Sequence, residues 1–229
     1  GHKGGGEGWC RQQCEWAAGK GAKVPGAMGG VAGQSWNVKR KIALPEKKMN
    51  KGHNMWPSHD QKQVYQTEWH GRSLFVVDRV TGAFLQEIDL GYDPAHVMTR
   101  VDTQQVHVGL NGDDGVVELN RDLTTGVLSY GRTISMQDPN HPTKQTQPHA
   151  HWMGFDGKHM VTPNSTSADS TLYAFTGLHT GNVIGKHDTG AVSVSAVMMP
   201  DSSKCYESTY PGHTRSDMYR SMFSTPIWG

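Results

Sequence analysis

The sequence has little cysteine, little net charge and no long apolar run. Three cysteines are too few to cross-link a chain of 229 residues as a disulfide scaffold. The formal net charge of +1 argues against a protein that binds nucleic acid through bulk positive charge. No apolar stretch reaches the roughly 18 residues that a spanning helix needs, so we expect no direct membrane span.

Glycine, histidine and methionine are abundant instead. The chain holds 28 glycines and 11 prolines, a share above the roughly 12% of average proteins, which indicates many turns. A hydrophobic content of 35% suits a turn-rich domain of short alternating strands better than a helical bundle. The thirteen histidines and eleven methionines stand out in a chain of such small net charge.

The first fifty residues differ from the rest of the sequence. We expect residues 1–50 to be an irregular, glycine-rich extension with one short helix over Trp9 to Gly19. That helix would carry Cys10 and Cys14 on one face, either as a disulfide or as two thiols. Because the chain starts at Gly1 without an apolar leader, it is either a processed mature chain or a fragment.

From residue 51 onward the sequence repeats. An aspartate opens each unit and is followed four residues later by an apolar residue, and these aspartates are Asp60, Asp102, Asp156 and Asp201. We expect them to be turn residues whose carboxylates accept hydrogen bonds from neighbouring backbone amides. Their spacings of 42, 54 and 45 residues fit the period of a four-stranded β-propeller blade.

A second turn recurs within each unit. A Thr-Gly pair follows the first three aspartates by 21 to 24 residues, at Thr81-Gly82, Thr125-Gly126 and Thr180-Gly181. A strand-like run precedes each pair and another follows it. The preceding runs are Ser73 to Val77, Gly115 to Leu119 and Ser170 to Phe175, and the following runs are Phe84 to Leu90, Val127 to Ile134 and Val183 to His187. The predicted fold is therefore an all-β propeller of four-stranded antiparallel blades, with about 3.5 blades in residues 51–229.

The order of these signals resembles the YVTN-type propeller repeat. It is clearest over Ser58 to Gly91 and Pro148 to Gly190, and the resemblance extends over about residues 51–210. The histidines at the blade entrances resemble those of the copper-binding propellers of nitrous oxide reductase and thiocyanate dehydrogenase. This resemblance implies copper, redox chemistry on a small molecule, and a periplasmic or extracellular location.

Blade geometry sorts the histidines by their offset from the blade aspartates. The segment that enters a blade and the loop between its second and third strands lie on the same face. Six histidines fall in such segments, and we predict that they hold the metal: His53, His70, His96, His149, His151 and His213. Neutral imidazole is a good ligand for copper and zinc, and we favour copper over zinc. Single histidines of this kind also line channels without any metal.

Two functions fit this sequence. The first is a copper-dependent oxidoreductase that acts on a small inorganic or one-carbon substrate and exchanges electrons with a redox partner protein. The second is a non-catalytic propeller that serves as a scaffold or accessory subunit of a larger redox or membrane complex. Closed propellers carry four to eight blades, so we expect a second chain or further blades to complete the fold.

Overall fold

A computed structural model describes residues 42, 51–137, 146–166, 169–174, 182–189, 192–210 and 223–226. Apart from Ile42, these residues belong to one compact unit, Lys47–Gly229. The expected extension over residues 1–50, Cys10, Cys14, His213 and the Thr180-Gly181 turn lie outside the described residues. In the described part of the chain, no helix is long and apolar enough to cross a membrane.

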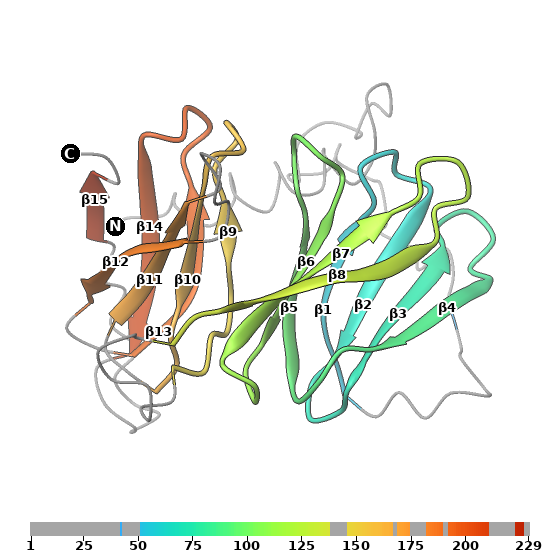
Figure 1. Ribbon diagram of the computed structural model, residues 1–229, viewed down its shortest axis with the longest axis horizontal. Helices are drawn as coiled ribbons and strands as arrows, with labels where there is room; N and C mark the ends of the chain where they lie inside the picture. Colours follow the sequence, from blue (N-terminus) through green and yellow to red (C-terminus); the bar gives the residue numbers. More distant parts are fainter. Residues whose placement is uncertain are drawn as a thin grey trace, which may run out of the picture. The chain divides into compact units, whose positions relative to one another are not determined.

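Fifteen β-strands form four antiparallel sheets in the described residues, and we call these sheets blades 1 to 4 (Figure 1). Blade 1 contains β1 (Gly52–Pro57), β2 (Gln63–Glu68), β3 (Ser73–Asp78) and β4 (Phe84–Asp89). Blade 2 contains β5 (Pro94–Thr99), β6 (Val106–Leu110), β7 (Gly115–Arg121) and β8 (Leu128–Ser135). Blade 3 contains β9 (Trp152–Met153), β10 (His159–Pro163), β11 (Asp169–Ala174) and β12 (Asn182–Asp188). Blade 4 contains β13 (Val192–Met198), β14 (Lys204–Tyr210) and β15 (Phe223–Pro226).

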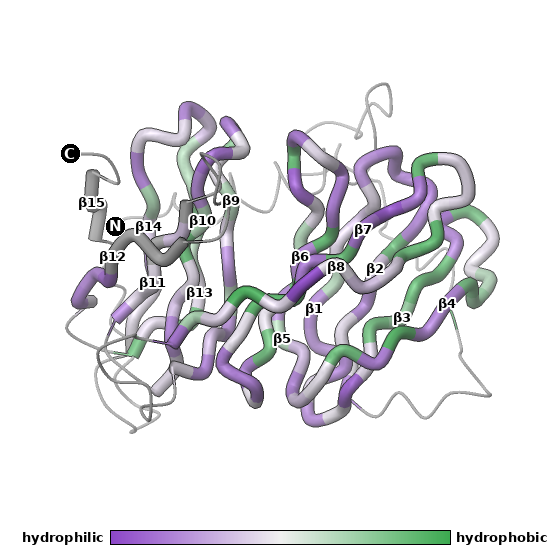
Figure 2. The backbone as a smooth tube through the Cα atoms, viewed as in Figure 1, coloured by the Kyte–Doolittle hydropathy of each residue, from purple (hydrophilic) through white to green (hydrophobic). Residues whose placement is uncertain are grey.

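Within each blade the strands pair in chain order, as consecutive antiparallel hairpins. Burial follows the position of a strand in its blade. In β2, buried and partly buried residues alternate, whereas the first five residues of β3 and of β7 are all buried. The last strand, β4, is mostly exposed, and apolar and polar residues are interspersed along it (Figure 2). Continuous burial, as in β3 and β7, is expected of strands that are covered on both faces, whereas the alternation in β2 indicates that one of its faces is more exposed than the other.

The predicted aspartate turns are confirmed. Each of the four aspartates lies between the first and second strands of its blade. The carboxylates of Asp60, Asp156 and Asp201 accept hydrogen bonds from the amide two residues later, at 3.2, 3.0 and 3.0 Å. Asp102 is different, because its carboxylate accepts two hydrogen bonds from the Arg100 guanidinium. The short side chain of aspartate suits such turns because it can reach the backbone locally.

The first two Thr-Gly turns also lie where they are predicted, between the third and fourth strands of blades 1 and 2. Gly82 and Gly126 both have a φ of 75°, a left-handed conformation in which a Cβ atom would be strained. Asp78 and Asp122 precede these turns, and each accepts hydrogen bonds from two backbone amides of its own turn. The sequence signal and the backbone requirement therefore agree at both positions.

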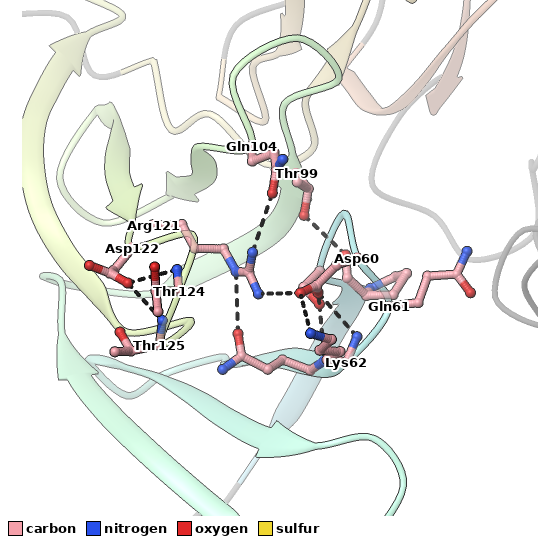
Figure 3. Close-up of polar contacts among 12 residues, drawn as sticks. Asp60, Gln61, Lys62, Thr99, Gln104, Arg121, Asp122, Thr124 and Thr125 are labelled. Carbon is pink, nitrogen blue, oxygen red and sulfur yellow. Dashed lines mark hydrogen bonds and ion pairs between the residues drawn. The ribbon is translucent and has the colours of Figure 1, made fainter.

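Neighbouring blades are joined by packing and by hydrogen bonds at the end that carries the aspartate turns. Buried apolar residues of blades 1 and 2, among them Tyr65, Leu74 and Val108, form one continuous cluster. The guanidinium of Arg121, at the end of β7, points toward Asp60 and lies 2.9 Å from its carboxylate (Figure 3). Burial alone would raise the pKa of Asp60, but hydrogen bonds from Ser58 and Arg121 outweigh it and lower that pKa.

The same end links the remaining blades. Arg100 of blade 2 donates a hydrogen bond to the carbonyl oxygen of Gly157 in blade 3, at 3.4 Å. The amide of Asp156 in blade 3 donates to the hydroxyl of Ser202 in blade 4, at 3.1 Å. Blades 1 and 2, blades 2 and 3, and blades 3 and 4 are thus each joined by a polar contact that involves a turn at this end.

Candidate metal centre

Three of the six predicted histidines come together in the structure. His53 lies in β1, His96 lies in β5, and His149 precedes β9, so each comes from a different blade. Their ring centroids are 5.4 Å apart for His53 and His96, 5.2 Å for His53 and His149, and 4.9 Å for His96 and His149. One nitrogen from each ring lies within 4.8 Å of the other two. We call these three residues the histidine triad.

Irregular strand pairing surrounds the first two triad residues. The pairing register shifts between Gly52 and Met55 in β1, a stretch that contains His53, and between Pro94 and Val97 in β5, a stretch that contains His96. The register of β13 shifts at the corresponding place, between Ser193 and Ser195. Bulges of this kind redirect side chains and are frequent beside functional sites.

Hydrogen bonds between blades 1 and 2 hold the two bulges together. The Asn54 side-chain oxygen accepts a hydrogen bond from the Val97 amide at 3.0 Å. The hydroxyl of Thr67, which is fully buried, donates to the Ala95 carbonyl oxygen at 2.6 Å and accepts from the Asn54 amide at 3.1 Å. The backbone on either side of His96 is therefore tied to the backbone beside His53.

His149 is oriented by blade 4. Its Nδ1 atom lies 2.7 Å from the carbonyl oxygen of Val194, which lies within the β13 bulge. Because a carbonyl oxygen only accepts, Nδ1 must carry the proton and Nε2 must carry the lone pair. A backbone carbonyl that fixes the tautomer in this way is the usual support of a metal-binding histidine.

The triad is electrostatically suited to a cation. Burial, reinforced by His149 and then His53, lowers the pKa of His96 to about 3. Burial is also the main cause that lowers the pKa values of His53 and His149. At neutral pH all three imidazoles are consequently uncharged, and only the uncharged form offers a lone pair to a metal.

Trp69 lies against the triad, although sequence reasoning did not select it. Its ring centroid is 4.6 Å from that of His53 and 5.2 Å from that of His149. Trp69 directly follows β2, in the loop between the second and third strands, which the blade argument assigns to the same face as the entry segments. This position between the second and third strands is the sequence signal from which Trp69 could have been selected.

His70 does not join the triad. It has a φ of 61°, its side chain is about half exposed, and its Nδ1 atom lies 3.2 Å from a carboxylate oxygen of Asp93. Its nearest aromatic neighbour is Trp69, at a centroid distance of 5.3 Å. His70 thus lies on the triad side of the molecule, but its imidazole is paired with a carboxylate.

His151 also lies apart from the triad. It is fully buried, and its pKa is well below the usual value because of burial and of the neighbouring His107 and His96. The centroid of the His107 ring is 6.3 Å away. Two methionines near the entry segments, Met98 and Met153, are buried in the apolar core.

The triad geometry is close to what a metal requires. Copper or zinc binds imidazole nitrogen at about 2.0 Å, which places two nitrogen atoms on one tetrahedral ion about 3.3 Å apart. The triad nitrogens lie within 4.8 Å of one another, so their separations exceed that spacing by at most about 1.5 Å. Three protein ligands leave one position open for a small molecule, as is common in catalytic sites.

Comparisons with known proteins support the fold. The sequence matches no protein-family model and no curated protein. The structure is similar to that of hydrazine synthase from Kuenenia stuttgartiensis, with a TM-score of 0.61, 17% identity, and 85% of this chain and 50% of that chain covered. It is similar to dihydro-heme d1 dehydrogenase NirN, with a TM-score of 0.57, 15% identity, and 77% of this chain and 37% of that chain covered. A third match is streptogramin B lyase, with a TM-score of 0.52, 11% identity, and 76% of this chain and 54% of that chain covered.

The chain folds as a β-propeller. The four-stranded antiparallel blades and the similarity to these propellers lead to the same conclusion, so the predicted all-β propeller fold is confirmed. The propeller chain spans about half of the length of the structures that it matches. Enzymes are among these structures, and at such low identity the likeness concerns the fold alone.

Proposed function

We propose that this propeller binds copper through His53, His96 and His149 and takes part in the oxidation or reduction of a small inorganic or one-carbon substrate. The observation that carries the proposal is the convergence of three uncharged imidazoles from three blades within 4.8 Å. Copper held by these three residues would supply one-electron redox chemistry for a small substrate bound beside the triad.

Copper is preferred to zinc because the ligand set is purely imidazole and because of the resemblance to copper-binding propellers. A three-histidine site also suits zinc, so the metal has to be identified by experiment. Trp69 and the buried faces of His96 and His149 exclude part of the solvent, which strengthens electrostatic interactions with a bound ion.

The remaining parts of the proposal come from the resemblance. The protein functions in the periplasm or outside the cell, receives or delivers electrons through a redox partner protein, and is completed by further blades or a second chain. His213, which lies outside the described residues, and His70 stay candidates for contacts to the metal or its substrate.

Metal analysis of the purified full chain tests this proposal. The protein is loaded with Cu(II) or Zn(II) in parallel, and we expect about one tightly bound Cu(II) at the triad, with nitrogen couplings in its electron paramagnetic resonance spectrum. Cu(II) also quenches the fluorescence of Trp69, which is assigned by comparison with Trp69→Phe.

His96→Ala combined with His149→Ala should abolish this Cu(II) signal, whereas His59→Ala, at an exposed position in the β1–β2 turn, should leave it unchanged. Wild-type protein that stays metal-free with an intact circular dichroism spectrum would contradict the proposal. So would a Cu(II) signal that persists in the double variant.

A non-catalytic scaffold remains the second candidate. It is favoured by the observation that the chain spans about half of the propellers that it matches, so catalytic groups of the whole protein can lie elsewhere. Triad variants that lose copper but still assemble with the partner protein, with unchanged activity of the assembly, would support the scaffold function.

A further inference from the structure

A glycine lies beside the triad in a buried strand. All five residues of β6 are buried, and Gly109 is the fourth of them. Its two neighbours in β6 pair with Val97 and Pro94, between which the register of β5 shifts. Gly109 therefore lies opposite the bulge that carries His96. A glycine inside a strand often marks a place where another backbone approaches closely.

The carbonyl group of His149 takes the space in which a side chain at position 109 would lie. The φ of Gly109 is outside the left-handed region, so its backbone conformation does not itself require glycine. A Cβ atom here would, however, lie 3.2 Å from the His149 carbonyl oxygen, closer than an ordinary van der Waals contact. The next atoms would lie at ordinary contact distances, His151 Nδ1 at 3.6 Å and the Pro148 carbonyl oxygen at 3.8 Å. The constraint thus comes from the backbone of a triad residue.

The same carbonyl group links two triad residues. The His96 amide donates a hydrogen bond to the His149 carbonyl oxygen at 3.4 Å. The ring centroids of His96 and His149 are 4.9 Å apart, the shortest of the three separations within the triad. The close approach of blade 3 to Gly109 and the shortest ring separation therefore occur at the same contact between blades.

Blade 1 has a side chain at the equivalent position. Thr67 follows Asp60 by seven residues, as Gly109 follows Asp102. Thr67 also lies opposite a bulge, that of β1, and its hydroxyl donates to the Ala95 carbonyl oxygen of blade 2 at 2.6 Å. At this position a side chain bridges blades 1 and 2, whereas the backbone of blade 3 itself reaches blade 2.

We propose that Gly109 is a positioning residue of the triad: because it has no side chain, His149 comes close enough to His96 for both to bind one copper ion. This inference rests on the proposed function.

His149 is held by two neighbouring blades at once. Its carbonyl oxygen is bound by His96 in blade 2, and its Nδ1 atom by the Val194 carbonyl oxygen in blade 4 at 2.7 Å. A methyl group at position 109 pushes the His149 backbone away from blade 2 by about a few tenths of an ångström, while Nδ1 stays bound to blade 4. The His149 ring then tilts relative to the other two rings. Binding sites tolerate displacements of only about 0.5 Å or 10–20°.

Gly109→Ala in the full chain tests the inference, with its folding checked by circular dichroism. We expect Cu(II) affinity, titrated against a competing chelator, to fall by about 10-fold. We also expect the nitrogen couplings in the electron paramagnetic resonance spectrum to change, because the orientation of one ligand ring changes. A packing defect away from the metal leaves that spectrum unaltered.

Gly115→Ala is the matched control. Gly115 lies in β7 of the same blade, and a Cβ atom there would also lie 3.2 Å from a carbonyl oxygen, that of Ile134, and 2.9 Å from Cγ2 of Thr133. Neither neighbour belongs to the triad. This variant should keep the wild-type Cu(II) affinity and spectrum.

Crystal structures of the metal-free wild type and of Gly109→Ala provide a readout that does not depend on copper. The separation of the His96 and His149 rings should increase in the variant, whereas that of His53 and His96 should not change. An unchanged separation, an unchanged affinity and spectrum, or a Gly109→Ala protein that cannot fold would overturn this inference alone. A wild type that binds no copper overturns the proposed function instead, and the ring separation still decides whether Gly109 positions His149.

Discussion

The histidine triad and the charged clusters of the propeller differ in how far their polar atoms are engaged by hydrogen bonds and ion pairs. In the triad, His53 and His96 make no hydrogen bond through their ring nitrogens within the described residues, and His149 uses only Nδ1. Around Glu118 and around Arg121, by contrast, the charged groups are engaged by partners of opposite sign. Open ligand atoms are what the proposed copper site requires, whereas saturated charges indicate a structural role.

The largest effect that we expect comes from the saturated region. Glu118→Gln removes the buried charge that pairs with Arg132 and His107, and it leaves Arg132 without its carboxylate partner. Breaking a buried ion pair in this way costs about 3–5 kcal/mol in free energy of unfolding. Urea denaturation measures the loss, and copper binding at the triad should be unaffected in the folded fraction. A loss well under 1 kcal/mol would show that the cluster is not a structural element.

A single substitution in the triad should lower copper affinity and leave the free energy of unfolding nearly unchanged. His149→Ala removes the ligand that Val194 orients, and we expect Cu(II) affinity to fall by about 100-fold or more with little change in the free energy of unfolding. Isothermal titration against a competing chelator measures the affinity. Equal affinity for the variant and the wild type would remove the distinction between the two regions.

The two regions should also titrate in different pH ranges. The pKa of His96 falls from 6.5 to about 3 on folding, so below pH 6.5 the unfolded state binds more protons than the folded state. The stability that His96 contributes to the metal-free protein is therefore nearly complete above pH 6.5 and decreases by about 2 kcal/mol as the pH falls to 5. Glu118, with a pKa lowered from 4.5 to about 2, contributes stability that is lost only below pH 4.5.

Urea denaturation at pH 7 and pH 5 checks this difference. His96→Leu should reduce the loss of stability between these two values by about 2 kcal/mol. The dependence that comes from the lowered pKa values of His53, His149 and His151, and the decrease below pH 4.5, should persist in that variant. A wild-type stability that is flat between pH 7 and pH 5 would indicate that His96 is protonated as easily in the folded as in the unfolded state.

The smallest effects concern the links between blades. Arg121→Ala removes a nearly buried guanidinium that binds Asp60, and we expect a loss of about 1–2 kcal/mol in the free energy of unfolding. Arg72→Ala is the matched comparison, because Arg72 pairs with Asp89 in a solvent-exposed position and should cause no measurable change. Thermal denaturation compares the two variants. Equal decreases in melting temperature would show that the link between blades adds no stability.

Much of the fold was predictable because its signals are local. An aspartate that bonds an amide two residues later and a glycine with a positive φ depend on a few consecutive residues, and both recur with the period of a blade. Of the six histidines that the offsets select, the structure brings His53, His96 and His149 together. Offsets specify the segment, however, and they do not specify the direction of the side chain.

The direction in which each histidine side chain points depends on features that no short motif encodes. The bulges in β1 and β5 decide where His53 and His96 point, and the Val194 carbonyl that fixes His149 comes from a different blade. His70 pairs with Asp93, which lies 23 positions later in the sequence. The ring of His151 lies near that of His107, which belongs to another blade. Trp69 contacts His53 within blade 1, but its contact with His149 arises only when blades 1 and 3 meet.

The sequence by itself determined the repeat, the turns and the set of segments that reach one face, because spacing and turn chemistry act over a few residues. Only the tertiary structure decided which imidazoles share a centre and which are buried or paired. Ligand geometry depends on angstrom-scale placement of side chains from separate blades, and that placement is set by strand register and by contacts between blades.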